Sequence, residues 1–202
     1  HLPQPGQVGQ TGRADFRVAH VQGGQLAQVG QVLHPRVAHP GARQGQPARI
    51  VAKFNALTDV GLIDALVAAG QAGARIDLVV RGACMLRPGV PGVTDRIRVR
   101  SVVGRFLEHT RAMYFRWGES DDDEALYLSS ADWMGRNMFR RIELAWPVRD
   151  PALRQRVIDE CLVPYLHDTL DAWTMGPDGS YRRVAADGVS AQQALMRRYG
   201  WT

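Results

Sequence analysis

One strand–helix–strand unit limits the folds that this chain can form. The run ARIVAK (48–53) is short and apolar and predicts a buried strand, and RIDLVV (75–80) predicts a second one. A helix fits between them, with a cap at Thr58 or Asp59 and an end at Gly70 or Gly73. A helix between two such strands predicts parallel neighbours joined by a right-handed crossover, and therefore an α/β fold.

The alternation of predicted strands and helices continues downstream with further strands and one long helix. Strands are expected at residues 97–103, 111–117, 125–130 and 140–148, of which the second and third are joined by the acidic hairpin loop GESDDDE and the fourth is the last strand of the chain. Asp150 and Pro151 begin a helix that is expected to reach about Trp173, because proline is tolerated at the first helical position. The pattern indicates a mixed β-sheet with helices on its faces.

Residues 1–43 have a different composition. They are rich in Gln, Gly and Pro, contain four of the six histidines, and show no sustained strand or helix periodicity. Such a segment buries too little apolar surface to offset the entropy of ordering, so it is expected to be a disordered tail. We therefore divide the chain into a low-complexity segment (1–43), a folded domain (44–175) and a carboxy-terminal extension with a short helix (176–202).

Charge and cysteine content narrow the functional classes. The net charge of the 202 residues is +5, but residues 1–43 carry four arginines against one aspartate, and the rest of the chain is nearly balanced. We therefore expect no nucleic-acid partner. No apolar run is long enough to span a membrane. The two cysteines, Cys84 and Cys161, lack disulfide-scaffold or metal-ligand spacing, so a reducing cytoplasm and no metal site are expected.

The candidate functional residues follow strands of the predicted sheet. Ligands of open α/β sheets bind beyond the carboxyl ends of strands, and Arg81 directly follows the second apolar strand. His109 and Arg111 stand at the start of another strand with the spacing that puts two side chains on one side. A guanidinium suits phosphate oxygens, and an imidazole can act as nucleophile or acid. The alternatives are an arginine paired to a surface carboxylate and a purely structural histidine.

A second polar group follows the strand at 125–130. The run LYLSSADWMGRN (126–137) supplies the hydroxyl of Ser130 and the carboxylate of Asp132. These groups could orient a histidine or hold phosphate oxygens, and they could equally be turn and helix-cap residues.

Six segments together resemble a known family. They are KFNALTD (53–59), LVVRG (78–82), LRPGVPG (86–92), RVRSVVGRFLEHTR (98–111), LYLSSADWM with RN (126–137) and RRIEL (140–144). In this order they resemble the carboxy-terminal domain of bacterial polyphosphate kinase, the second of its two phospholipase-D-like domains. By this similarity His109-x-Arg111 and Ser130-x-Asp132 look like degenerate counterparts of the His-x-Lys and Gly-Ser-x-Asn elements of the phospholipase D superfamily.

The resemblance implies a fold and a reaction. The fold would be a phospholipase-D-like domain with a mixed sheet flanked by helices, and the reaction a reversible transfer of the terminal phosphate of ATP to polyphosphate, with Mg²⁺. Arg81 and His109 would contact the ATP phosphates, with His109 as the catalytic residue and Arg111, Ser130 and Asp132 in support. ATP, ADP and inorganic polyphosphate would be the ligands, and family members form homo-oligomers in the cytoplasm, in some cases at the membrane.

The resemblance also implies that part of the enzyme is missing. In the family, the phosphorylated histidine and the magnesium ligands belong to the preceding domain, which would have to be supplied in trans. We expect the isolated chain to have little or no kinase activity. The family has aliphatic elements where this chain has residues 1–43, so that segment is interpreted as a non-native reading frame, or else as a disordered adaptor.

Two other functions remain open at this point. One is a phosphodiesterase of the phospholipase D type, whose second half-site would come from a dimer. The other is a non-catalytic module that binds polyphosphate or other anions.

Overall fold

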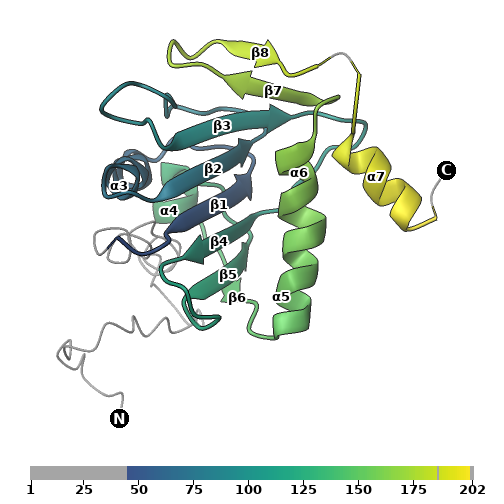
Figure 1. The fold of residues 1–202 in the computed structure, drawn as a ribbon, viewed down its shortest axis with the longest axis horizontal. Helices are drawn as coiled ribbons and strands as arrows, with labels where there is room; N and C mark the ends of the chain where they lie inside the picture. Colours follow the sequence, from purple (N-terminus) through teal and green to yellow (C-terminus); the bar gives the residue numbers. More distant parts are fainter. Residues whose placement is uncertain (1–44, 186, 201–202) are drawn as a thin grey trace.

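The computed structural model describes residues 45–185 and 187–200. Eight strands form one mixed sheet in the order β6-β5-β4-β1-β2-β3-β7-β8 (Figure 1). Strands β1, β2 and β3 are parallel to one another, and the other neighbouring pairs are antiparallel. The strands are β1 (Arg49–Phe54), β2 (Arg75–Val80), β3 (Ile97–Val102), β4 (Ala112–Arg116), β5 (Glu124–Ser129), β6 (Ala145–Pro147), β7 (Ala172–Met175) and β8 (Tyr181–Arg183). The α/β class with a mixed sheet and flanking helices is confirmed.

The predicted strand–helix–strand unit is present. Helix α3 (Val60–Gln71) connects β1 to β2, and these two strands pair in parallel. The carboxylate of Asp59 accepts a hydrogen bond from the backbone N–H of Leu62 at 3.0 Å, so Asp59 is the N-cap. The helix ends because Gly73 has a φ of 115°, a left-handed backbone that glycine adopts without strain.

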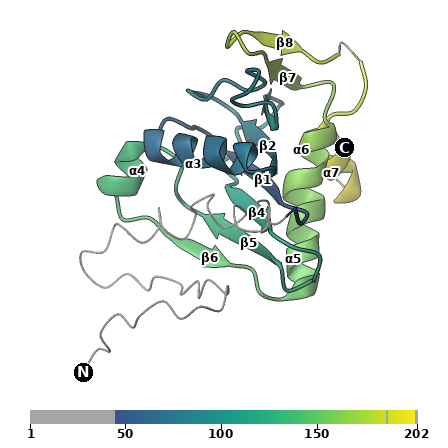
Figure 2. The same ribbon diagram turned by 60° about the vertical axis from the view of Figure 1, so that its left-hand side comes forward.

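The two faces of the sheet are covered by different helices (Figure 2). Side chains alternate along a strand, so Ile50, Ala52 and Phe54 face α3 in the main core, and Val51 lies on the opposite face with Leu162. That opposite face is covered by α5 (Pro151–Val157), the π-helical turn η2 (Ile158–Leu162) and α6 (Val163–His167), which run as one continuous helix.

The predicted acidic hairpin joins β4 and β5. These strands pair in an antiparallel register, and Asp121 and Asp122 are exposed at the tip. Glu124 begins β5 and forms ion pairs with Arg116 of β4 at 3.5 Å and with Arg154 at 3.0 Å, and the second of these connects the hairpin to α5.

The helix that begins at Pro151 is shorter than predicted. Asp150 caps it as expected, with its carboxylate accepting from the N–H of Leu153 at 2.8 Å. It ends at His167 rather than near Trp173, because Arg100 donates to carbonyls of its last turn, including that of Tyr165 at 2.9 Å. The fully buried Asp168 then turns the chain into β7.

The strand predicted at 140–148 is also shorter, and it is not the last one. Only Ala145–Pro147 pair with β5, since Asn137 and Glu143 stabilise a short helix, α4 (Gly135–Phe139), and the turn after it. Strands β7 and β8 follow and extend the other edge of the sheet beyond β3.

The carboxy-terminal extension contains the expected short helix, α7 (Ala191–Arg198). Ala191 packs in the same apolar cluster as Tyr165 of α6. The segment predicted to be disordered, residues 1–43, lies outside the described residues, and the proposed domain boundaries stay predictions. In the described part of the chain, no helix is both long enough and apolar enough to cross a membrane.

We expect Leu66→Ala to lower the free energy of unfolding by about 2–5 kcal/mol, because Leu66 is fully buried between α3 and the sheet and its truncation leaves a cavity. Urea denaturation measures the change. The matched control is Leu153→Ala in α5, where the side chain is exposed and the expected loss is below about 0.5 kcal/mol. Equal losses in the two variants would contradict the assignment of this core.

Candidate phosphate-binding site

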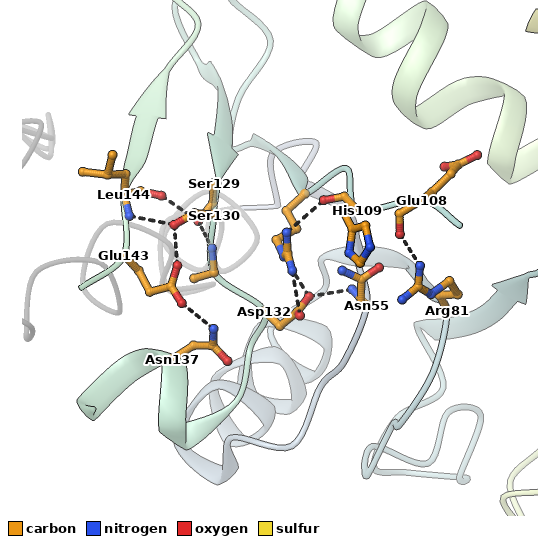
Figure 3. Close-up of polar contacts among 12 residues, drawn as sticks. Asn55, Arg81, Glu108, His109, Ser129, Ser130, Asp132, Asn137, Glu143 and Leu144 are labelled. Atoms are coloured by element: carbon orange, nitrogen blue, oxygen red, sulfur yellow. Dashed lines mark hydrogen bonds and ion pairs between the residues drawn. The ribbon is translucent and has the colours of Figure 1, made fainter. Parts of the chain in front are cut away.

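The candidate residues come together at the carboxyl ends of the parallel strands (Figure 3). Asn55 follows β1, Arg81 follows β2, and His109 lies in the loop that leads into β4. Asp132 lies in the loop after β5, because β5 runs antiparallel to β4 and so ends beside its start. Strand direction therefore gathers residues that are up to 77 positions apart in the sequence.

Two arginines hold consecutive carbonyl groups of the His109 loop. Arg81 donates a hydrogen bond from Nη1 to the carbonyl oxygen of Glu108, and Arg111 donates from Nη1 to the carbonyl oxygen of His109 at 2.9 Å. The peptide on either side of His109 is thus fixed by a guanidinium. Figure 3 shows the imidazole of His109 directed toward the region between Arg81 and Asp132.

The guanidinium of Arg111 is occupied by Asp132. Its Nε and Nη2 each donate to one carboxylate oxygen of Asp132 at 3.0 Å, the bidentate geometry that gives strong charge-assisted hydrogen bonds. The backbone N–H of Asn55 donates to the same carboxylate at 2.7 Å. Burial alone would raise the pKa of Asp132, but these hydrogen bonds and the charge of Arg111 outweigh it, so the pKa lies below its ordinary value.

Glu108 anchors the other side of the loop in a buried network. Its carboxylate forms an ion pair with Lys53 and accepts hydrogen bonds from the hydroxyl of Tyr165 and from Nε2 of Gln192, the latter at 2.7 Å. The ammonium of Lys53 also lies 3.7 Å from the centre of the Tyr165 ring. Burial would raise the pKa of Glu108, but Lys53 and the hydrogen bonds lower it below its ordinary value.

Gln192 brings the last helix into the same network. Its amide forms a two-way contact with the backbone of Phe106, in which Oε1 accepts from the N–H at 2.8 Å and Nε2 donates to the carbonyl at 2.9 Å. The His109 loop is therefore held by β1 through Lys53, by α6 through Tyr165 and by α7 through Gln192.

Asn55 and Arg81 border a small cavity that Lys53 and Glu108 also line. The side-chain nitrogen Nδ2 of Asn55 is buried and makes no hydrogen bond of normal geometry, although it lies close enough to the carboxylate of Asp132 to help lower its pKa. An unpaired buried donor is costly in a folded protein and is found mainly where a bound group or a function accounts for it. Its place beside Arg81 makes it a candidate donor to an anion.

Ser130 belongs to a neighbouring cluster and not to the Arg111–Asp132 pair. Its hydroxyl donates to the carboxylate of Glu143 and accepts from the N–H of Leu144 at 2.9 Å. Asn137 donates to the other oxygen of Glu143. These contacts stabilise the turn between β5 and β6, which agrees with the structural alternative for Ser130.

The structure thus brings together four of the five predicted site residues, Arg81, His109, Arg111 and Asp132. Their roles in binding or catalysis stay predictions. Sequence reasoning did not single out Glu108, Lys53 or Asn55. Lys53 offered a signal, because it is the chain's one lysine and it lies in a strand predicted to be buried, where a charge needs an acidic partner.

The described residues do not fit a magnesium site. No group of three or more His, Cys, Asp or Glu side chains that could hold a metal ion is present among them. The carboxylates of Glu108 and Asp132, whose contacts hold the His109 loop, are already paired with Lys53 and Arg111.

The fold is therefore an α/β domain in which Arg81 and His109 lie beyond the carboxyl ends of strands, where open sheets bind their ligands. An arginine and a histidine at this place are typical of domains that bind anionic ligands. Residues 31–194 match a family profile described as polyphosphate kinase C-terminal domain 2. Polyphosphate kinase from Burkholderia multivorans is 49% identical over 190 residues, covering 88% of this chain and 27% of that protein. Polyphosphate kinase from Xylella fastidiosa is 49% identical over 159 residues, covering 77% of this chain and 22% of that protein.

A solved structure gives the same result. The crystal structure of polyphosphate kinase from Porphyromonas gingivalis superposes with a TM-score of 0.75 and 36% identity, covering 82% of this chain and 25% of that one. The chain therefore belongs to the polyphosphate kinase family, in which it corresponds to the carboxy-terminal domain. It spans about a quarter of the length of the curated relatives that it matches.

We expect Asp132→Asn to lower the free energy of unfolding by about 2–4 kcal/mol at pH 7, because Arg111 loses its charged partner. Since the pKa of Asp132 in the folded chain is lower than its ordinary value of 3.8, its contribution to stability is present above that value and is lost as the pH falls through the lowered one. The difference between the variant and the parent chain should therefore shrink on going from pH 6 to pH 3. Urea denaturation across this range tests the prediction, and a difference that stays constant would contradict it.

Glu108→Gln should lower the free energy of unfolding by about 3–5 kcal/mol, because it leaves the charge of Lys53 buried without a partner. The double variant Lys53→Met/Glu108→Gln removes both charges and should recover part of this loss. The comparison is made by chemical denaturation at neutral pH. A double variant less stable than the single one would show that the ion pair is not the main contribution of Glu108.

Proposed function

We propose that this domain binds the phosphate groups of ATP at Arg81 and His109 and takes part in the reversible transfer of its terminal phosphate to polyphosphate. The convergence of Arg81, His109 and the unpaired donor of Asn55 at one edge of the sheet is the observation that carries the proposal. Family membership supports it, because the matched relatives are named polyphosphate kinases.

The proposed roles follow from the contacts. Arg81 uses Nη1 for the Glu108 carbonyl and keeps its remaining guanidinium N–H groups for phosphate oxygens. Nδ2 of Asn55 donates a further hydrogen bond to the same phosphate. His109 holds or releases a proton at the transferred phosphate or its leaving oxygen, while Arg111, neutralised by Asp132, fixes the backbone of the loop.

The complete reaction needs the portion of the enzyme that this chain does not span. In this proposal the phosphorylated histidine and the ligands of Mg²⁺ come from the other three quarters of a polyphosphate kinase, and the ion enters with ATP. ATP and polyphosphate as substrates, together with the free thiols of Cys84 and Cys161, fit a cytoplasmic location. The phosphodiesterase alternative has no specific observation in its favour.

The test uses this chain and a chimera. Incubated with ATP, Mg²⁺ and polyphosphate, the chain alone should show little turnover. Turnover comparable to that of a complete family enzyme would refute the claim that the reaction needs the other three quarters of the enzyme. In the chimera, this chain replaces the corresponding quarter of the Burkholderia multivorans enzyme and should restore synthesis of polyphosphate from ATP.

Within the chimera, His109→Gln should lower kcat by about 10²- to 10⁴-fold, as expected for the loss of a proton-transferring group. Arg81→Gln should raise KM for ATP and lower kcat/KM by at least about tenfold. The control is Arg149→Gln, which removes the same charge from an exposed position after β6 and should change neither constant more than about twofold. If the His109 and Arg81 variants behaved like this control, the proposed site would be wrong.

A further inference from the structure

A second cationic region lies at the opposite end of the parallel strands from His109. A groove of about 590 Å³ opens there between the starts of β1, β2 and β3 and one side of α6. Its walls include the side chains of Arg49, Arg75, Arg98 and Arg100, with His167 on the α6 side. None of these groups takes part in the site around Arg81 and His109.

The strand pattern explains why the groove is open and charged. On the face covered by α6, strands β2 and β3 begin with charged residues and end with an apolar one, whereas β1 carries Arg49, Val51 and Lys53 there. Thus Arg98 and Arg100 precede Val102 in β3, and Arg75 and Asp77 precede Val79 in β2. The apolar residues pack against Tyr165 of α6. The helix passes over the carboxyl halves of these strands and leaves their starts uncovered (Figure 1).

The groove contains more arginine side chains than carboxylates that could pair with them. Asp77 is the one carboxylate in the lining, and its Oδ2 accepts from both Arg49, at 3.3 Å, and Arg75, at 3.2 Å. Arg49 and Arg75 are direct neighbours in the register of β1 and β2, an arrangement of like charges that costs stability. Arg100 also interacts with the charge of the buried Asp168, so Arg49, Arg75 and Arg98 share one carboxylate and leave a local excess of positive charge.

Two of the guanidinium groups keep unused donors. Arg98 lies opposite Asp77 in the register of β2 and β3, but its side chain makes no hydrogen bond or ion pair with any described residue. The Nε of Arg49 is buried and has no hydrogen-bond partner. Unpaired donors beside an excess of positive charge are the features of a site that is completed by an anion.

The shape and lining favour a linear chain of phosphates. Arg49, Arg75 and Arg98 lie on three adjacent strands, which are spaced about 4.8 Å apart, so their charges extend over about 10 Å and exceed the size of one phosphate. Guanidinium groups match phosphate oxygens in a bidentate geometry. No Phe, Tyr or Trp is among the described residues that line the groove, so it offers no ring on which the bases of a nucleic acid could stack.

We propose that this groove is a second binding site, which holds a segment of inorganic polyphosphate away from the Arg81–His109 site. The choice of polyphosphate over other linear anions rests on the proposed function, whereas the anion site itself rests on the contacts of the groove. A growing or shortening chain held at both ends of the sheet would stay bound between successive transfers.

The test is an NMR titration of the ¹⁵N-labelled chain with inorganic tripolyphosphate, and then with longer polyphosphate, at low ionic strength. The backbone amides of residues 49, 75 and 98 should shift on binding. Arg98→Gln should weaken the affinity read from these signals by about tenfold, the loss expected for one charge-assisted contact. The affinity of Arg98→Lys should lie between those of the parent chain and Arg98→Gln, because lysine keeps the positive charge but lacks the planar guanidinium. Arg98 is exposed, so both variants should fold.

The matched control is Arg141→Gln, which removes the same charge from an exposed position after α4 and should change the affinity of the groove less than about twofold. Arg81→Gln should likewise leave the groove signals unchanged. If the signals of residues 49, 75 and 98 did not shift while those of residues 81 and 109 did, the proposal of a second site in the groove would be wrong and the proposed function would stand. The reverse pattern would support the groove and count against the Arg81–His109 site.

Two further outcomes would overturn the proposal. Equal weakening by Arg98→Gln and Arg141→Gln would mean that only the net charge of the chain matters. Binding of oligothymidylate at the groove as tight as that of polyphosphate of the same charge would mean that the groove is a nucleic-acid site.

Discussion

The carboxylate of Asp132 joins three segments that are far apart in the sequence, and the arrangement of the candidate site rests on it. It accepts the backbone N–H of Asn55 after β1 and both sides of the Arg111 guanidinium at the start of β4. Arg111 in turn holds the carbonyl of His109. Backbone hydrogen bonds also join these loops, for example from the N–H of Gly82 to the carbonyl of Asn55 and from the N–H of Ser129 to the carbonyl of Arg111. The charge-assisted contacts of the Asp132 carboxylate add to this backbone pairing and fix the side chain of Arg111.

Glu108 complements this arrangement from the other side of the loop. Its network reaches Lys53 in the centre of the sheet and both carboxy-terminal helices, through Tyr165 and Gln192. These contacts fix the backbone on both sides of His109, so the loop loses little freedom when a ligand binds, and a preorganised loop favours phosphate transfer. The same contacts make α7 part of the site's support, although this helix begins more than eighty residues after His109.

The alternation of residues along the parallel strands produces both the main core and the arginine groove. On the α3 face, strands β1 and β2 are apolar along their length and form the main core. On the α6 face, β2 and β3 are charged at their starts and apolar toward their ends, so α6 packs on one half and leaves the other half to arginines. Arg81 and His109 then occupy the loops beyond the carboxyl ends. The domain therefore presents positive charge at both ends of its parallel strands.

The sequence by itself determined the strand–helix–strand unit, the β4–β5 hairpin and the cap at Asp150, and it limited the first helix cap to Thr58 or Asp59, because periodicity and capping act over a few residues. It also determined which polar residues follow strands, and so four members of the candidate site. Only the tertiary structure decided where the last long helix ends, since Arg100 of β3 donates to its last carbonyls and the N–H of Ala191 in α7 donates to Asp168, the residue that follows the helix. It likewise decided the pairing of β7 and β8 and the partners of Lys53 and Arg111, because an ion pair between residues 20 to 60 positions apart exists only once the sheet has brought their strands together.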